Sequence, residues 1–292
     1  MLMKQSLLFF ALTAISCSSF AYNVQFDAGF RSFDHDNNYI DQDYQADIKG
    51  KYYFDPVQIK NNPLNEAAFL GRNSNVYGGY AYRTIESQDY LTYDPLSTST
   101  FYELARAKDE KDLHYFTGGL EYFHEQFYLN GEIGLGIVKI KSNIDSNYGS
   151  VRYKNDYNVT TYRALVGYMP ISNLLIAAGV DGFSGDKYLD DETDFAAKIK
   201  YVMPIGQNGH YLNLEANGVF GDENNVIFTA DYYLTHAFSI GSAYSLKDDD
   251  ESNNNFLWFR SKYFVNENVA IGAEAGFSSG MNLFTVNGTF RF

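Results

Sequence analysis

The sequence is poor in cysteine and proline and contains no long apolar run after its first residues. Among 292 residues there are one cysteine, one tryptophan and five prolines. The cysteine, Cys17, lies in an N-terminal segment that we expect to be removed, so the remaining chain would have neither disulfide nor thiol chemistry. After residue 21 no apolar stretch approaches the ~20 residues of a membrane-spanning helix. A helix-based membrane protein is therefore excluded.

The first 21 residues have the layout of a secretory signal peptide. Lys4 precedes an apolar run from Leu7 to Ile15, and Ser19 to Ala21 form a small-x-small site. We expect cleavage after Ala21, which leaves residues 22–292 as one domain. Lipidation of Cys17 is the disfavoured alternative, because Ala14 stands where a leucine usually precedes lipoprotein cleavage.

Basic residues are too few for a nucleic-acid-binding protein. The formal net charge is −14, so a polyanion would be repelled. Mean hydropathy is −0.32, which conventional scanning assigns to a soluble protein. Yet 17% of residues are aromatic, with 26 tyrosines and 24 phenylalanines. Those aromatic side chains need a surface against which to lie.

Alternation with period two recurs along the whole chain. In residues 284–292, apolar or small residues occupy every second position and polar residues stand between them. Such a segment is a strand with one apolar and one polar face. The same pattern predicts fourteen strands, within limits of twelve to sixteen. The predicted strands are residues 24–30, 46–54, 76–82, 116–122, 127–137, 162–168, 174–180, 195–201, 212–220, 226–234, 238–244, 257–263, 269–277 and 284–292.

The connections between these strands alternate in length and chemistry. Short joints such as residues 124–126 and 265–268 alternate with polar segments such as 142–156, 183–192 and 247–255. Aromatic residues gather beside the short joints, as the girdle of a membrane barrel does. The pattern predicts an all-β fold, a transmembrane antiparallel up-and-down β-barrel with short periplasmic turns and longer acidic extracellular loops. A soluble β-sandwich would explain the alternation but not the asymmetry of the two rims.

The last strand would close the barrel against the first. With Phe290 and Phe292 in the aromatic positions, it resembles the C-terminal recognition signal of Gram-negative outer-membrane proteins. It departs from that signal because Asn287 stands where a glycine is common and Gly288 comes one place late. The resemblance implies that the barrel-assembly machinery is a partner.

A second resemblance lies in residues 62–82, NPLNEAAFLGRNSNVYGGYAY, with YYFDPV before it. These residues are similar to the second turn of the Gammaproteobacterial putative porins, which carries a P-L-x-E-A-A-F-L-x-R stretch. The resemblance implies an outer-membrane β-barrel porin, in a family without a defined substrate. Residues 64–70 are too helix-prone for a strand and lie on the short-turn rim, where we expect a small periplasmic helix or a cap.

If the apolar face is outward, the alternate positions line the interior. The interior charges then include Asp27, Arg31, Asp47, Asp194, Lys262 and Arg291 together with twelve pore-lining candidates. The candidates are Lys49, Lys51, Arg83, Glu121, Glu132, Arg163, Lys198, Lys200, Glu215, Asp231, Arg260 and Glu274. So many charges indicate a water-filled passage with a transverse field rather than a dry core, the alternative being an interior closed by ion pairs.

The outer loops carry further candidates. The segment 87–112 would either fold inward and narrow the pore or remain outside in solvent. The acidic runs 190–192 and 248–251 would concentrate cations at the mouth and could bind divalent ions that bridge to lipopolysaccharide, although such runs are usually just solvated. Asp34 and Asp36 begin a calcium-loop pattern, but Tyr39 and Gln45 break it, so no metal site is expected.

Nothing in the sequence supports an enzyme or a cofactor. His35, between Asp34 and Asp36, is the only acid–histidine cluster near the outer rim, and no nucleophile signature accompanies it. We therefore expect a passive porin for small hydrophilic solutes and ions, with modest cation preference, in the outer membrane of a Gram-negative bacterium. The alternative is a non-conducting structural or surface-interaction barrel that binds ions, lipopolysaccharide or a host partner. Between a monomer and a trimer we expect a monomer, because no strand shows a flat, enlarged interface.

Overall fold

A computed structural model describes residues 21–37, 39–96, 104–186, 191–206, 209–248 and 255–292. The signal peptide therefore lies outside the described residues, except for Ala21. Strands dominate, with one short helical segment. The strands are β1 (Ala21–His35), β2 (Ile40–Gln58), β3 (Asn75–Ser87), β4 (Tyr90–Tyr93), β5 (Leu104–His124), β6 (Phe127–Ser146), β7 (Gly149–Ile171), β8 (Leu174–Gly185), β9 (Glu192–Ile205), β10 (His210–Phe220), β11 (Asn224–Thr235), β12 (Phe238–Asp248), β13 (Phe256–Asn266), β14 (Val269–Phe277) and β15 (Met281–Arg291).

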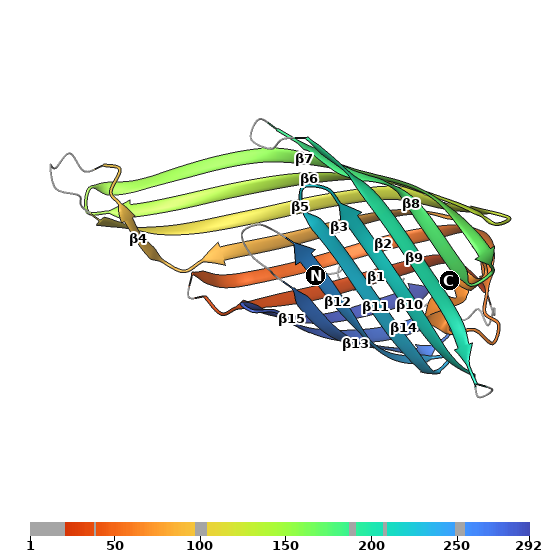
Figure 1. Cartoon of the computed structure of the whole chain (residues 1–292). Coiled ribbons are helices and arrows are strands. Elements are labelled where there is room, and N and C mark those ends of the chain that lie inside the picture. The colour runs from red at the N-terminus through yellow and green to blue at the C-terminus, as the bar shows by residue number, and fades with distance from the viewer. Residues whose placement is uncertain (1–20, 38, 97–103, 187–190, 207–208, 249–254) are drawn as a thin grey trace, which may run out of the picture.

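The strands form a closed antiparallel barrel (Figure 1). Each strand pairs with its neighbours in the chain, and β1 pairs with β15, for example through Gly29 and Asn287. Strand β3 pairs directly with β5, so the short β4 lies outside the closed ring and adds only to the outer end of β5. The wall thus has the fourteen strands predicted from the alternation, and closure leaves no unpaired sheet edge at the membrane.

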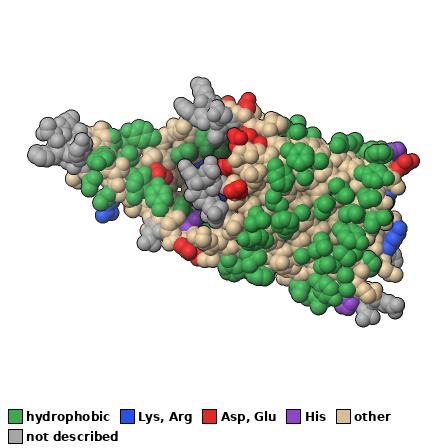
Figure 2. Space-filling view, in the orientation of Figure 1, with side chains coloured by type: hydrophobic (Ala, Val, Ile, Leu, Met, Phe, Trp, Pro, Cys, Tyr) green, Lys and Arg blue, Asp and Glu red, His purple; other side chains and the backbone are tan. Residues whose placement is uncertain are grey.

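The period-two pattern places one face of each strand outward. Outward side chains such as Ile133, Val166 and Phe290 are 61%, 65% and 55% exposed, and Figure 2 shows hydrophobic side chains spread over the barrel wall. Inward side chains such as Asn213, Asp231 and Thr285 are buried. An apolar exterior and a polar interior are the reverse of a soluble sandwich, and they suit a barrel that spans lipid. Among the described residues, no helix is both long and apolar enough to cross a membrane.

Three strands are much longer than the sequence pattern indicated. The polar connection expected at residues 142–156 is wrong, because β6 and β7 continue as a hairpin in which Ser146 pairs with Gly149. Likewise, the outer loop expected over 87–112 is strand from Leu104 onward. Strands β5, β6 and β7 therefore project past the outer rim (Figure 1). Polar residues concealed this extension, since a strand in water on both faces has no apolar alternation to reveal it.

Parts of the acidic outer connections lie outside the described residues. This holds for Asp190 and for residues 249–251 of the predicted acidic runs, and for residues 97–103 of the 87–112 segment. The described part of that segment forms β4, which pairs with the outer end of β5 beyond the closed ring, for example through Thr92 and Ala105. That part of the segment does not fold into the lumen.

Candidate functional site: a plugged, charged lumen

The connection between β2 and β3 folds into the periplasmic end of the barrel. It contains a 3-10 turn, η2 (Leu64–Glu66), and one turn of α-helix, α2 (Ala67–Leu70), so the helix expected at 64–70 is confirmed. We call residues 59–74 the plug. Within it Leu64, Glu66 and Ala67 are buried, with 1%, 2% and 1% of their surface exposed. A periplasmic turn on the surface would expose these side chains, so the segment is packed inside the barrel.

Three apolar side chains fix the plug to three sectors of the wall. Ala67 packs with Tyr22 and Tyr53, which belong to β1 and β2. Phe69 packs against a cluster formed by β6 to β9, which includes Tyr128 and Leu175. Leu64 packs with Phe264 and Ala270 of β13 and β14. Because these three contacts are spread around the circumference, the plug spans the lumen rather than following one side of it.

Polar contacts reinforce this seat. The Glu66 carboxylate lies 2.8 Å from the ammonium nitrogen of Lys200 and accepts a hydrogen bond of 2.5 Å from the Tyr233 hydroxyl. The Leu64 amide donates to the carbonyl of His236 at 2.8 Å, and the Arg291 guanidinium donates to the carbonyl of Leu64 at 3.0 Å. These contacts satisfy the Leu64 backbone groups and Oε1 of Glu66, and the charge of Lys200 offsets the buried Oε2, which accepts no hydrogen bond of good geometry.

The charge of Glu66 is retained despite its burial. Desolvation by itself would raise the pKa of this carboxyl group, but the charge and close contact of Lys200 and the hydrogen bond from Tyr233 outweigh it and hold the pKa below its usual value. The plug is therefore held by an ionised carboxylate at neutral pH.

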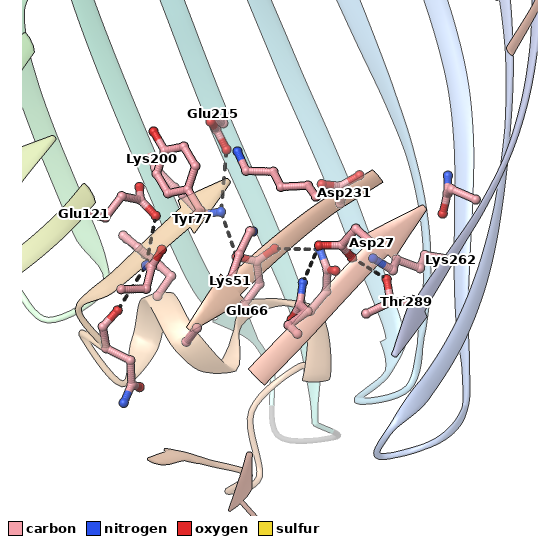
Figure 3. Close-up of a pocket in the computed structure, with 18 of the residues that line it drawn as sticks. Asp27, Lys51, Glu66, Tyr77, Glu121, Lys200, Glu215, Asp231, Lys262 and Thr289 are labelled. Carbon is pink, nitrogen blue, oxygen red and sulfur yellow. Dashed lines mark hydrogen bonds and ion pairs between the residues drawn. The ribbon is translucent and has the colours of Figure 1, made fainter. Parts of the chain in front are cut away.

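Above the plug the lumen is a polar cavity of about 600 Å³ (Figure 3). Its walls come from both ends of the chain and from the strands between, and its floor includes Asn65, Glu66 and Phe69 of the plug. Side chains alone do not fill the interior of a barrel this wide. The structure thus combines an unfilled polar cavity with a segment of the same chain packed across the periplasmic end of the barrel.

All of the pore-lining candidates except Arg83 line this cavity. Arg83 lies apart from it and donates two hydrogen bonds, of 2.8 and 2.7 Å, to the buried Asp43. The Asp43 carboxylate also lies 2.8 Å from Nε2 of His35, so this histidine has a partner in the same ion-pair network. That the lining side chains conduct solute stays a prediction.

Ion pairs tie several of the lining residues together. Asp231 accepts two bonds from Arg260, at 2.7 and 2.6 Å. Glu215 lies 3.5 Å from each of Lys198 and Lys200, and Arg163 pairs with Asp181. Glu121 accepts from Tyr128 at 2.8 Å, and Glu132 accepts from Tyr77 at 2.8 Å. The charged interior predicted from the alternation is thus present, and it is partly neutralised in pairs.

Sequence reasoning did not include Glu66 among the site residues. The only feature of the sequence that could have indicated Glu66 is that it is a single carboxylate inside the apolar stretch Leu64–Leu70. A glutamate at such a position on a surface helix would have no special role. Among the described residues, no group of three or more histidine, cysteine or acidic side chains is arranged to hold a metal ion.

The fold defines this chain as an outer-membrane type β-barrel. A family model described as "Putative general bacterial porin" matches residues 1–97, the part that contains the P-L-x-E-A-A-F-L-x-R stretch. The match confirms the resemblance read from that motif. No curated protein matches the chain.

Several solved structures share the fold. The Acinetobacter baumannii outer membrane protein Omp33 is 20% identical, with a TM-score of 0.62, and the match covers 94% of this chain and 99% of that one. The translocator domain of the autotransporter NalP from Neisseria meningitidis is 10% identical, with a TM-score of 0.53 over 99% and 95% of the two chains. The toluene transporter TodX of P. putida is 8% identical, with a TM-score of 0.54 over 92% and 90%. At these identities the likeness establishes the barrel fold alone.

Proposed function

We propose that this protein is a gated porin, a passive outer-membrane channel for small hydrophilic solutes and ions that opens when the plug leaves its seat. The observation that carries the proposal is the polar cavity of about 600 Å³ with charged walls, below which a segment of the same chain is packed inside the barrel. A barrel with only a structural role has no need of an unfilled, charged interior. The match of residues 1–97 to a porin family model supports the same function.

The plug has the properties of a gate. It is a connection between two strands, so it can move without breaking any strand pairing of the wall. It is held to the wall by side-chain contacts and single hydrogen bonds, among them the Glu66–Lys200 pair, the bonds at Leu64 and the bond from Arg72 to the carbonyl of Glu125, and not by strand pairing. Local opening of a connection, with the strands left paired, is a motion that proteins use for gating.

The test is the single-channel conductance of refolded residues 22–292 in a planar bilayer under a salt gradient. We expect a mostly closed channel with discrete openings and a measurable reversal potential, and the modest cation preference inferred from the sequence would appear in its sign. A folded barrel that is silent, both with the native plug and with the plug released by Glu66→Gln, would contradict the proposal.

A second function has one observation in its favour. Strands β5, β6 and β7 extend past the outer rim, and Tyr93, Leu104 and Tyr148 on this projection are 66%, 59% and 61% exposed. We propose as the alternative a surface-interaction barrel whose projection contacts a partner or lipopolysaccharide outside the cell. If the protein is a surface-interaction barrel, shortening the β6–β7 hairpin would abolish binding of the partner. If the protein is a porin, the same change would leave its conductance unchanged.

A further inference from the structure

The basic side chains that line the cavity fall into two groups. Five of them have a carboxylate oxygen within 4 Å, in the pairs Arg31–Asp47, Arg163–Asp181, Lys198–Glu215, Lys200–Glu66 and Arg260–Asp231. The other four form no ion pair with any described residue, and they are Lys49, Lys51, Lys262 and Arg291. The unpaired bases therefore contribute positive charge that the wall itself does not neutralise.

These four bases lie in one sector of the barrel. The order of neighbouring strands is β2, β1, β15, β14, β13, and the four belong to β2, β15 and β13. Gln25 of β1 pairs with Lys51 on one side and with Arg291 on the other, so these two bases are about 10 Å apart at their backbones. The charges of Lys51 and Arg291 both act on Lys262. The group is thus a single electrostatic cluster.

One acid lies within the cluster, and it does not pair closely with any of the four bases. Asp27 accepts hydrogen bonds of 2.7 Å from the Gln25 amide and of 2.7 Å from the Thr289 hydroxyl. Figure 3 shows Asp27 between Lys51 and Lys262 above Glu66. Glu274 of β14 lines the same cavity and forms no ion pair with a described residue, so it is a second carboxylate of the sector. Four unpaired bases against these two carboxylates leave the sector with an excess of positive charge. Such an excess in a narrow, low-dielectric lumen focuses the field that attracts anions.

The hydrogen-bond donors of this cluster differ in whether they already have an acceptor within the protein. Arg291 is fixed by Gln25 at 2.8 Å and by the carbonyl of Leu64 at 3.0 Å. The ammonium groups of Lys51 and Lys262 have no protein acceptor among the described residues, and each offers three N–H donors. The hydroxyl of Tyr22, which lines the same cavity, is also buried and lacks a hydrogen-bond partner there. Free donors therefore converge on the cavity just above the plug.

We propose that Lys51 and Lys262, supported by Lys49, form a binding site for small oxyanions, that is, solutes that carry a carboxylate or phosphate group. The inference rests on the proposed porin function and names a class of solute that this sector binds, within a channel whose overall preference among small ions is modestly for cations. Ammonium groups bind carboxylate and phosphate oxygens as charge-assisted donors, and a cavity of about 600 Å³ accommodates a small metabolite. The overall charge of −14 repels anions, so their passage requires a local positive site of this kind.

The test separates binding from conduction. Inorganic phosphate and succinate are titrated by calorimetry into detergent-refolded residues 22–292, with glycerol as the neutral probe. The same barrel is then placed in a planar bilayer to record its conductance. The binding variant is Lys51→Gln with Lys262→Gln. The matched control is Lys108→Gln with Lys141→Gln, which removes the same charge from bases that are already paired and that do not line the cavity. Heat-modifiable migration and circular dichroism confirm that each variant is folded.

We expect phosphate, succinate or both to bind, glycerol not to bind, and the binding variant to lose at least tenfold in affinity while the control changes less than twofold. Binding of only one anion identifies its group as the preferred one. Absence of binding to the folded native barrel, or an equal loss in both variants, would overturn the site. A barrel that binds the anions but never conducts would support the binding site and refute the porin function. A barrel that conducts but does not bind them would support the porin function and refute the binding site.

Discussion

The Glu66 carboxylate of the plug lies 2.8 Å from the Lys200 ammonium group of β9, inside the barrel. This pair joins two segments more than a hundred residues apart in the chain and ties the plug to the inner wall of the barrel. Glu66 is 2% exposed, so the interaction is little screened by solvent. The relationship makes the plug the part of the molecule with the clearest experimental consequences.

Glu66→Gln should open the channel. The amide keeps the shape of the side chain and removes its charge, while Lys200 keeps a carboxylate, Glu215, at 3.5 Å. Removing one partner of a buried pair costs about 3 kcal/mol, which corresponds to roughly a hundredfold rise in the ratio of open to closed time. Single-channel recording measures that ratio. The control is Glu267→Gln, a carboxylate of the β13–β14 turn on the same rim, which should leave the ratio unchanged. An equal effect of both substitutions would contradict a specific role of Glu66.

A disulfide between the plug and the wall should hold the channel closed. Ala237 packs against the cluster that contains Leu64, and the Leu64 amide binds the neighbouring His236 carbonyl at 2.8 Å. The pair Leu64→Cys with Ala237→Cys is introduced into residues 22–292, which contain no other cysteine. Oxidation should suppress the openings and dithiothreitol should restore them, with each single variant indifferent to both treatments. Unchanged openings in a barrel whose disulfide is verified by mass spectrometry would show that solutes do not pass through movement of the plug.

The plug should respond to acid but not to mild changes of pH. The pKa of Glu66 is held below its usual value, since the charge and close contact of Lys200 and the hydrogen bond from Tyr233 outweigh the raising effect of burial. A depressed folded pKa means that the carboxylate stabilises the plug fully at pH values above the ordinary pKa of a free carboxyl group, and that this contribution is lost as the pH falls through the lower folded value. Conductance should therefore be constant between about pH 8 and pH 5 and rise in stronger acid.

The Glu66→Gln variant supplies the control for this pH dependence. It has no carboxyl group to protonate at residue 66, so its conductance should lack the acid step. A step of the same size in the variant would assign the pH dependence to another group.

Phe292→Ala should impair assembly of the barrel more than a matched substitution elsewhere on the same strand. The Phe292 ring stacks on Phe26 at 5.8 Å between centroids, and its backbone exchanges two hydrogen bonds with Val24, at 2.9 and 3.0 Å. An aromatic contact of this kind contributes about 1 kcal/mol. We therefore expect spontaneous folding into lipid vesicles to fall only slightly and assembly by the barrel-assembly machinery to fall several-fold. Folded barrel is quantified by heat-modifiable migration.

Phe284→Ala is the matched control, because Phe284 also points to lipid from β15 and is 56% exposed. It removes the same ring without touching the last residues. If Phe284→Ala reduces machinery-dependent assembly as much as Phe292→Ala does, Phe290 and Phe292 have no special recognition role and the loss reflects apolar area alone.

The local pattern of the sequence was sufficient for the wall of the barrel. Each strand has its apolar residues on one face, as in Phe284, Val286 and Phe290, and this period is fixed by backbone geometry whatever the strand contacts. The number of barrel strands, the outward and inward faces and the short helix at residues 64–70 follow from such local information. The even strand count also returns the last strand to the rim where the first began, which allows the two to pair antiparallel.

Distances across the lumen were not available from the sequence. Lys200 and Lys51 have the same chemistry and the same inward direction, yet Lys200 is neutralised by Glu66 and Lys51 has no described ion-pair partner. The difference depends on where the plug enters the barrel and on the stagger of the strands, which are fixed only when the ring closes. The outward extension of β6 and β7 was hidden for a related reason, since pairing of Ser146 with Gly149 is a contact between strands that both stand in water. The sequence by itself determined which face of each strand meets lipid, because alternation is a local property. The tertiary structure alone decided which charges meet one another and that a segment of the same chain is packed across the lumen.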